Sequence, residues 1–147
     1  MSTVSRTTDV DAARIWDVLA DAHGYAEWVM GAKTIRGEEG RWPEPGAAFH
    51  HTVGVGPLQV RDNTVVEEME PGRRLVLRAR FRPIGVARIR LELHPDGDSC
   101  RVEMEEHVVR PALLAHAEPL LDPLIRLRNT ESLRRLEGAA RDPGARG

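Results

Sequence analysis

The chain has 147 residues, of which 41% are hydrophobic and 30% charged, and its formal net charge is −2. These values are typical of one soluble globular domain that is large enough to bury a core of its own. The nearly balanced charge gives no electrostatic case for nucleic acid or an anionic membrane as a partner.

The N-terminal region predicts a strand followed by two short helices. Residues 2–8 are polar and β-prone, which favours a first strand. Asp9 and Asp11 then offer capping carboxylates to a helix whose apolar residues Ile15 and Leu19 share one face. A second short helix is expected over residues 21–30, with Gly31 as its end.

The middle of the chain predicts an antiparallel meander. Turn signals containing Pro and Gly occur at residues 42–46, 54–57, 71–72, 83–85 and 95–97, and the segments between them are short and rich in β-branched residues. Residues 74–81 and 87–94 alternate between apolar and polar side chains, so each has one inward face. Residues 58–69 alternate poorly, and their inward face stays unassigned.

The last predicted hairpin turns at residues 95–98, and its two strands fall into an apparent register of charge pairs on one face and apolar pairs on the other. Glu106 then stands at the end of the apolar face, where a packed core gives way to a candidate site. The predicted opposite pairs are His94–Ser99, Glu92–Arg101, Arg90–Glu103, Arg88–Glu105 and Ala87–Glu106.

The last third of the chain predicts a long helix. Asp122 and Pro123 are typical of an N-cap followed by the first helical residue. The expected inward stripe consists of Ile125, Asn129, Leu133, Leu136 and Ala140. Residues 111–121 form either a connector or a kinked lead-in, and residues 141–147 are expected to be a disordered tail to a single domain over residues 1–140.

This order of elements predicts an α+β fold. A strongly curved, seven-stranded antiparallel sheet wraps around a long C-terminal helix, with two short helices after the first strand. If the helix stands off from the sheet, the inward side chains line a cavity.

Several segments resemble the START-like (SRPBCC) superfamily, and within it the bacterial polyketide cyclase/dehydrase group. Residues 7–21, followed by Tyr25 and Trp28, are similar to the opening of that superfamily, and residues 70–77 resemble its central hairpin. Arg128, Asn129, Leu133 and Leu136 are similar to its terminal helix. The resemblance covers roughly residues 2–140.

The resemblance implies a helix-grip fold with a hydrophobic cavity, and it names no cofactor. Members bind lipids, isoprenoids, polyketides or other apolar molecules, and some catalyse cyclisation, aromatisation or dehydration. The fold alone does not choose among these activities. No single catalytic motif is shared by the superfamily, so site residues must be argued from this chain.

Two residues are candidates for acid–base catalysis. Glu106 shares a face with Val102, Met104 and Val108, and a carboxyl group there can act as a general acid or base. His51 enters the cavity if Phe49 faces inward, and imidazole suits proton transfer near neutral pH. The structural alternatives are a Glu106 at the cavity rim, hydrated or paired with an arginine, and a histidine that is hydrogen-bonded or exposed.

The candidate ligand-binding residues come from the sheet, the second helix and the terminal helix. Arg128 and Asn129 face the sheet, where they can orient a ligand carbonyl or pair with Glu106; alternatively Arg128 extends to solvent and Asn129 bonds the backbone. Trp28 either covers a ligand or plugs the core. The remaining candidates are Tyr25, Leu77, Phe81, Leu91, Met104 and Leu133.

No metal site or cofactor is expected. His50 and His51 point to opposite faces of their strand, and the other histidines are scattered, so the spacing for a zinc site is missing. The single cysteine, Cys100, cannot form an internal disulfide, which fits a reducing cytoplasm. Lys33 is the only lysine among many arginines, which indicates a GC-rich bacterial genome. No stretch approaches a membrane span, and either a monomer or a homodimer is compatible with the sequence.

Three functions remain open. The first is a binding protein that holds an apolar small molecule between the sheet and the terminal helix. The second is a polyketide cyclase, aromatase or dehydratase, which requires at least two polar groups to converge inside the pocket. The third is a protein-interaction module with a filled core.

Overall fold

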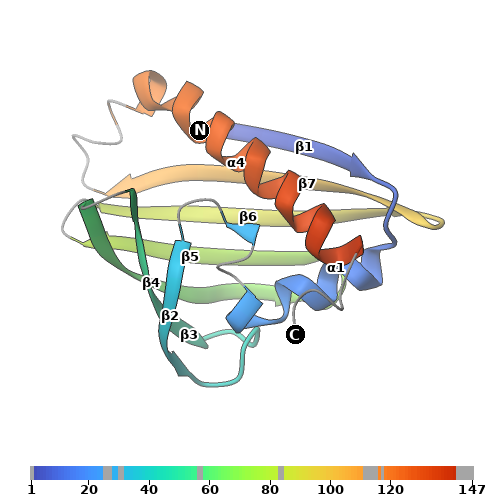
Figure 1. The fold of residues 1–147 in the computed structure, drawn as a ribbon, viewed down its shortest axis with the longest axis horizontal. Coiled ribbons are helices and arrows are strands. Elements are labelled where there is room, and N and C mark those ends of the chain that lie inside the picture. The colour runs from blue at the N-terminus through green and yellow to red at the C-terminus, as the bar shows by residue number, and fades with distance from the viewer. Residues whose placement is uncertain are drawn as a thin grey trace.

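A computed structural model describes residues 2–24, 28–29, 32–55, 58–82, 85–110, 116 and 118–141. One curved antiparallel sheet and one long helix dominate it (Figure 1). The elements in chain order are β1 (Ser2–Thr8), α1 (Ala12–Leu19), the 3-10 turn η1 (Ala22–Gly24), β2 (Ala32–Glu39), β3 (Ala48–Val55), β4 (Leu58–Glu70), β5 (Arg74–Arg82), β6 (Gly85–Asp96), β7 (Ser99–Arg110) and α4 (Glu118–Arg141). The predicted helix-grip architecture is confirmed.

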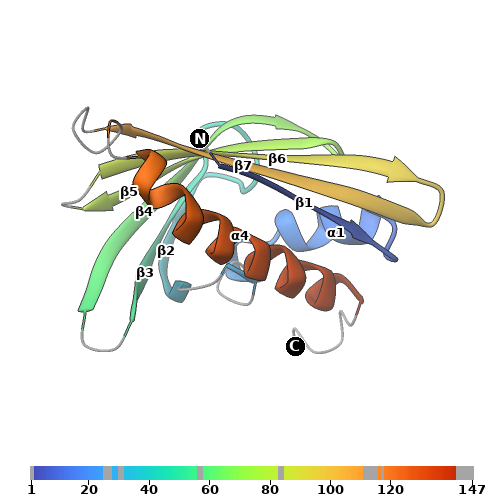
Figure 2. The same ribbon diagram turned by 90° about the horizontal axis from the view of Figure 1, so that it is seen from above.

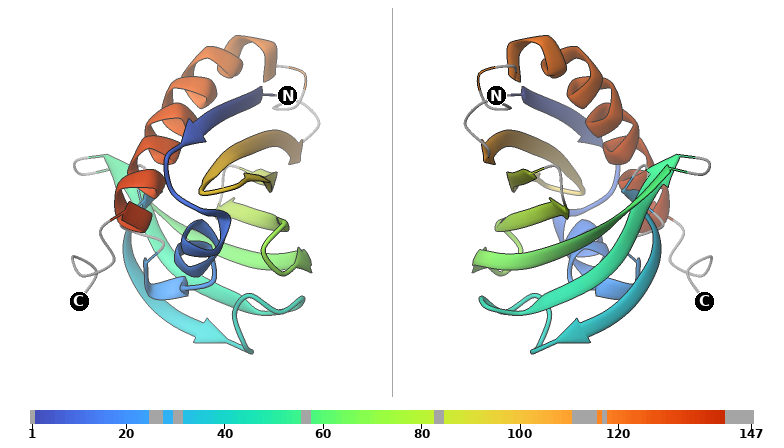
Figure 3. Two further views of the ribbon diagram at one scale, coloured as in Figure 1. Left: turned by 90° about the vertical axis from the view of Figure 1, so that its right-hand side faces the viewer. Right: turned by 90° about the vertical axis from the view of Figure 1, so that its left-hand side faces the viewer.

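The sheet has seven strands in the order β1-β7-β6-β5-β4-β3-β2. Strands β2 to β7 form the predicted meander, and β1 joins the sheet beside the last strand. Helix α4 lies across the concave side, and its main packing partners are β1, α1 and β7 (Figure 2). The first strand and the last helix of the chain therefore lie side by side, and the sheet curls away from them toward β2 (Figure 3).

Helix α1 begins as the sequence predicts. The Asp11 side chain accepts a hydrogen bond from the Arg14 backbone N–H at 2.9 Å, which satisfies one donor of the first turn. The predicted second helix over residues 21–30 is represented by η1, while residues 25–27 and 30–31 lie outside the described part. Trp28 is buried in the core.

The β6–β7 hairpin is shifted by two residues from the predicted register. Asp96 pairs with Ser99, so the loop contains only Gly97 and Asp98. The φ of Gly97 is 62°, which suits the first position of a tight two-residue hairpin loop. The prediction was wrong because Pro95 and Asp96 were counted as turn residues, whereas they extend β6. A shift of two keeps every side chain on its predicted face.

The corrected register changes which charges face each other. Arg90 is opposite Glu105, and their side chains are 2.8 Å apart, whereas Glu92 is opposite Glu103. That like-charged pair is compensated by Arg90, which lies 3.4 Å from Glu92, and by Arg101, which lies 3.3 Å from Glu103. The convex face is therefore a network of diagonal ion pairs rather than a simple ladder.

A register shift explains the poor alternation of β4. The pairing of β4 with β5 slips between Val66 and Glu68. Thr64 and Val66 are buried on the inward side, and after the shift Met69 is the next residue to pack against the core. An irregularity of this kind changes the parity of inward positions within one strand.

Helix α4 starts earlier than the sequence predicts. Asp122 was expected to be the N-cap, but α4 begins at Glu118 and contains Pro123. Pro123 is the sixth residue of α4, so its missing N–H removes the intrahelical hydrogen bond to the carbonyl of residue 119. Asn129, Leu133, Leu136 and Ala140 of the predicted stripe are buried, and Ile125 is half-buried. None of the described helices combines the length and the apolar run that crossing a bilayer requires.

Candidate functional site

Five polar residues meet beneath the N-terminal half of α4, at one end of the concave face. They come from three elements that are far apart in the chain, and we call them the polar corner: Ser2 of β1, Glu106 of β7, and Asp122, Arg128 and Asn129 of α4. Both strands contribute through direct pairing, because Ser2 is opposite Glu106 in the register of β1 and β7.

Glu106 is the centre of this corner. Only 4% of the residue is exposed, although its neighbours on the same face of β7, Met104 and Val108, are apolar and buried. The opposite residue on β6 is Ile89, not Ala87 as the sequence predicts, because of the shifted hairpin register. A carboxylate is therefore embedded in an apolar surface, where it requires charged or hydrogen-bonding partners.

Two side chains of α4 supply these partners. Arg128 Nη1 donates to Glu106 Oε1 at 3.1 Å, and Asn129 Nδ2 donates to the same oxygen at 3.3 Å. Asn129 is fully buried, whereas the Arg128 side chain is 25% exposed. The guanidinium therefore reaches from the solvent edge of the helix to the buried carboxylate, and Asn129 bonds the carboxylate rather than the backbone.

Ser2 and Asp122 form the outer part of the corner. Ser2 Oγ donates to Asp122 Oδ1 at 2.8 Å, and this hydrogen bond lowers the pKa of the Asp122 carboxyl below its ordinary value. Asp122 and Asn129 are seven residues apart and thus lie on the same side of α4. Asp122 ties the helix to β1 instead of capping its N-terminus.

Apolar side chains of the sheet and the helix form one buried core cluster, which includes Met104 on the same face of β7 as Glu106. Trp28 belongs to the same buried core as these residues. The sequence-predicted lining residues that are buried in the core are Leu77, Leu91, Met104 and Leu133. Each was predicted from alternation in a strand or from helical spacing, and each faces the core.

Three other candidates cannot be placed at the corner. Tyr25 lies outside the described residues, and the side chains of His51 and Phe81 lie outside them too. The backbone places His51 on β3, in register with Ile35 and Asp62. The neighbouring His50 is at the surface, where its Nε2 lies 3.6 Å from Glu39 Oε1.

Trp42 is an aromatic residue in the connection between β2 and β3. Its Nε1–H donates to the Leu19 carbonyl at the end of α1, at 3.0 Å. Its ring packs edge-on against the Phe49 ring, with the two ring centroids 4.6 Å apart. These contacts fasten the β2–β3 connection to α1, so Trp42 caps the loop.

The convex face has hollows of a different character. One of about 290 Å³ is bounded by Arg74, Arg88, Arg90, Glu105 and other residues. Arg88 lies 3.2 Å from Glu67 and Arg90 lies 2.8 Å from Glu105. A shallow surface of neutralised charges offers no site for an apolar molecule, so the convex face is a solvated ion-pair network.

Among the described residues, no group of three His, Cys, Asp or Glu side chains is close enough to hold a metal ion.

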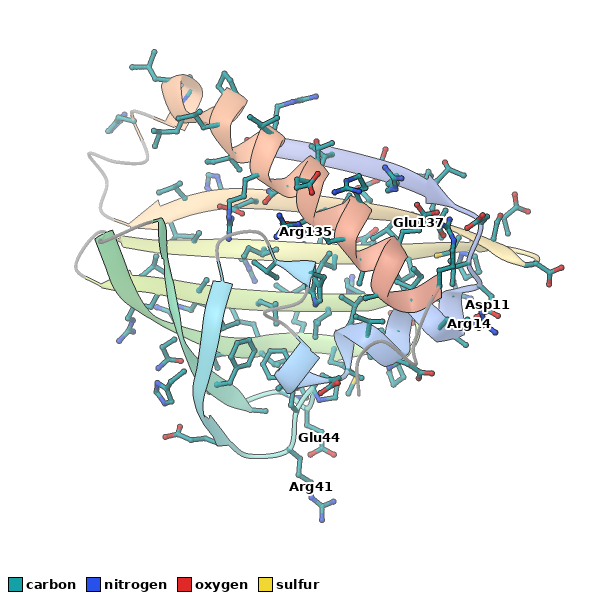
Figure 4. All side chains as sticks on the ribbon, viewed as in Figure 1. Asp11, Arg14, Arg41, Glu44, Arg135 and Glu137 are labelled. Atoms are coloured by element: carbon teal, nitrogen blue, oxygen red, sulfur yellow. The ribbon has the colours of Figure 1, made fainter. Side chains whose placement is uncertain are left out.

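Sequence reasoning missed a second buried carboxylate, Glu137, which Figure 4 labels on α4. Arg6 of β1 lies 2.9 Å from its Oε1, and Arg141 lies 3.1 Å from its Oε2. The Asp9 backbone N–H also donates to Oε2 at 3.2 Å. The sequence signal for its burial was helical spacing, which places Glu137 beside Leu133, Leu136 and Ala140. Its contacts hold α4 against β1 and the Asp9 backbone, which is a structural role.

The polar corner brings a buried carboxylate together with amide and guanidinium donors. An ionised carboxylate has about four acceptor sites, and the two hydrogen bonds from α4 use Oε1. A ligand hydroxyl or enol can therefore donate to Glu106, while amide and guanidinium donors lie beside it. The same carboxylate can accept and return a proton.

Known structures share this fold at low sequence identity. The Zhui aromatase/cyclase from Streptomyces sp. R1128 superposes with a TM-score of 0.70 at 18% identity, covering 95% of this chain and 92% of that one. Protein NE0264 from Nitrosomonas europaea gives 0.73 at 16% identity, with coverage of 97% and 95%. Protein CV1439 from Chromobacterium violaceum gives 0.72 at 15% identity, with 94% of each chain covered.

No curated protein matches the chain. The family model described as "Polyketide cyclase / dehydrase and lipid transport" matches residues 2–141, which is nearly the whole sequence. The chain therefore belongs to the polyketide cyclase / dehydrase and lipid transport family.

Proposed function

We propose that the protein binds an apolar small molecule, such as a polyketide, lipid or isoprenoid, between the concave face and α4. The observation that carries this proposal is the buried carboxylate of Glu106, held by Arg128 and Asn129 within an apolar surface. The apolar part of the ligand packs against the inward leucines, and its hydroxyl or carbonyl group lies at the polar corner.

Energetics support an oxygen-bearing ligand over a pure hydrocarbon. A buried ion pair contributes little net stability compared with apolar residues of the same size. Ligand recognition therefore explains a buried carboxylate at this position better than a contribution to folding stability does. A ligand hydroxyl that donates to it gains a charge-assisted hydrogen bond, which is about twice as strong as a neutral one.

Binding can be measured with two probes. Nile red reports an apolar space, and emodin, a hydroxylated anthraquinone, adds donors for Glu106. We expect Glu106→Gln to weaken emodin binding about tenfold, as the loss of one hydrogen bond to a charged group predicts, and to change Nile red binding little. Glu105→Gln is the matched control, because Glu105 directly precedes Glu106 on β7 and pairs with Arg90 on the convex face.

Native mass spectrometry of protein purified from its own host, with organic extraction, identifies the physiological ligand. A retained polyketide, lipid or isoprenoid supports the proposal. A ligand-free mass, together with no binding of either probe, contradicts it and favours a filled core and an interaction module.

Catalysis is the second candidate, and the convergence of Glu106, Arg128 and Asn129 favours it. With a poly-β-ketone, the Glu106 carboxylate would remove a proton from a methylene between two carbonyls. The resulting enolate carbon would bond to another carbonyl carbon of the same chain, and Glu106 would return the proton to the new alkoxide. The neighbouring donors would stabilise the negative oxygen.

Turnover separates catalysis from binding. If the protein is a cyclase, Glu106→Gln should remove turnover of a poly-β-ketone thioester while its affinity stays within about tenfold. Turnover that survives in this variant would show that Glu106 is not the proton carrier.

A further inference from the structure

The outward side of α4 carries a row of exposed leucines. Leu120, Leu124 and Leu127 are 83%, 67% and 69% exposed, and we call them the leucine ridge. Their spacing places them on one side of the helix, opposite the buried Asn129, Leu133 and Leu136. Isolated exposed leucines are common, but three in a row on one helix suggest a contact surface.

Arginines surround the ridge. Arg126, Arg134 and Arg135 are exposed, whereas the Arg128 side chain is 25% exposed and pairs with Glu106; Arg135 is labelled on α4 in Figure 4. The described acidic side chains of the same helix are engaged: Asp122 with Ser2, Glu131 with Arg134 and Arg135, and Glu137 with Arg6 and Arg141. Helix α4 as a whole has five arginines against the four acids Glu118, Asp122, Glu131 and Glu137, a net charge of +1, whereas the whole chain has a net charge of −2.

The shape of this surface favours a bilayer over a folded partner. Helix α4 lies at the outside of the molecule (Figures 2 and 3). Its exposed leucines therefore project outward from the helix. A lipid surface accepts a ridge without a complementary groove. A stable dimer needs roughly 800 Å² from each partner, far more than three leucines supply.

We propose that the leucine ridge docks on an anionic lipid bilayer, with the leucines in the acyl–headgroup boundary and the flanking arginines against the lipid phosphates. Leucine on one side and arginine beside it is the composition of helices that lie in the membrane interface. Docking does not require a bound ligand, so it can be tested independently of the proposed binding of a small molecule.

Vesicle co-flotation tests the proposal. The probes are vesicles of phosphatidylcholine alone and vesicles in which about one lipid in three is phosphatidylglycerol. We expect binding to the anionic vesicles only, and weaker binding as salt is raised, because salt screens the arginines. Replacing the ridge by serine, Leu120→Ser/Leu124→Ser/Leu127→Ser, should reduce the bound fraction at least about tenfold.

Two further variants make the result specific. Arg126→Gln/Arg135→Gln should weaken binding and flatten its salt dependence, whereas Arg78→Gln/Arg80→Gln on β5 of the convex face should leave binding unchanged. All of these substitutions are on the surface, so circular dichroism should show the same thermal unfolding midpoint as the parent protein.

Three outcomes would overturn the proposal. The first is no flotation with anionic vesicles at low salt. The second is flotation that persists in the triple serine variant. The third is a dimer in analytical ultracentrifugation that dissociates in the triple serine variant, since the ridge would then bind a second copy of this chain.

Discussion

At the scale of single residues, the decisive contact is the one between Glu106 and Arg128. The 3.1 Å hydrogen bond joins a carboxylate that is almost fully buried to a guanidinium at the helix edge. Removing the arginine leaves a buried carboxylate whose remaining hydrogen-bond donor, among the described side chains, is the Asn129 amide. The cost of such a change is set by the charge that remains, not by the bond that is lost.

We therefore expect Arg128→Leu to lower the free energy of unfolding by about 3 kcal/mol, the low end for a buried ion pair, because the Arg128 side chain is 25% exposed. Glu106→Gln should cost less, about 1 kcal/mol, because a neutral amide replaces the buried charge. Urea unfolding followed by circular dichroism measures both. Arg126→Leu, an exposed position two residues earlier, is the control and should change stability by less than about 0.5 kcal/mol. Equal losses at residues 126 and 128 would contradict the assigned role of the ion pair.

Gly97 tests the corrected hairpin register. Its φ of +62° is strained for a side chain with Cβ, although nothing lies within 4 Å of a Cβ added there. Gly97→Ala should therefore destabilise the protein by about 1 kcal/mol through the backbone alone. Gly138 of α4 also has open space around it but no positive φ, so Gly138→Ala should stabilise by up to about 1 kcal/mol. Thermal unfolding should show opposite signs for the two variants, and a stabilised Gly97→Ala would contradict the two-residue loop.

At the scale of elements, α4 is held differently along its length. Its C-terminal half is anchored by buried Leu133, Leu136 and Ala140 and by the Glu137 contacts. Its N-terminal half presents leucines to solvent and is tied to the sheet through the polar corner. Because local stability follows apolar burial, the N-terminal half should open first.

An acid titration of α4 should show a contribution from Glu131. Hydrogen bonds from Arg134, and then from Arg135, lower the pKa of Glu131 to about 2, against an ordinary value of 4.5. A lowered pKa in the folded state adds stability above the unfolded value, and this stability is lost as the pH falls from about 4.5 toward 2. Because Glu131 lies at the surface, the contribution is small and screened by salt.

The comparison of Glu131→Gln with the parent protein isolates this contribution. The difference between their thermal unfolding midpoints should be present at neutral pH, shrink below pH 4.5 and decrease in high salt. Arg141 lowers the pKa of the exposed Asp9 carboxyl by a hydrogen bond, so Asp9 adds to the same acid sensitivity. A difference that grows as the pH falls would contradict the direction of the Glu131 shift.

At the scale of the whole molecule, the two ends of the described chain stabilise each other. Strand β1 pairs with β7 and packs against α4, so residues 2–8 meet residues 99–110 and 118–141. Contacts of such long sequence separation form only when most of the chain is ordered. We therefore expect the sheet and the C-terminal half of α4 to unfold together.

Cys100 provides a chemical measure of this cooperativity. Its side chain is fully buried on β7, and burial raises the pKa of the thiol above its ordinary value of 9.0. In native buffer at pH 8 the thiol should react with an aromatic disulfide reagent only through opening of the fold. The reaction should accelerate with urea in parallel with the loss of circular dichroism. Rapid reaction without denaturant would contradict the burial of Cys100.

Strand identities, the direction of alternation in β5 and β6 and the inward stripe of α4 followed from the sequence, because each depends on the local period of apolar residues. Glu106 was found as an exception to such a period. Arg128 and Asn129 were predicted to face the sheet and, as one alternative, to pair with Glu106. Both hydrogen-bond to Glu106, which for Glu106 itself is the arginine-paired arrangement of its structural alternative.

Other features required the tertiary structure, for physical reasons. The hairpin register depends on the loop geometry at Gly97. The pattern of opposite charges in the sequence suggested a different register, shifted by two residues. The change of face in β4 comes from a shift against β5, and the role of Asp122 comes from its bond to Ser2 at the other end of the chain. Periodicity determines which side of an element is apolar, but only packing between distant segments decides which polar groups meet on that side.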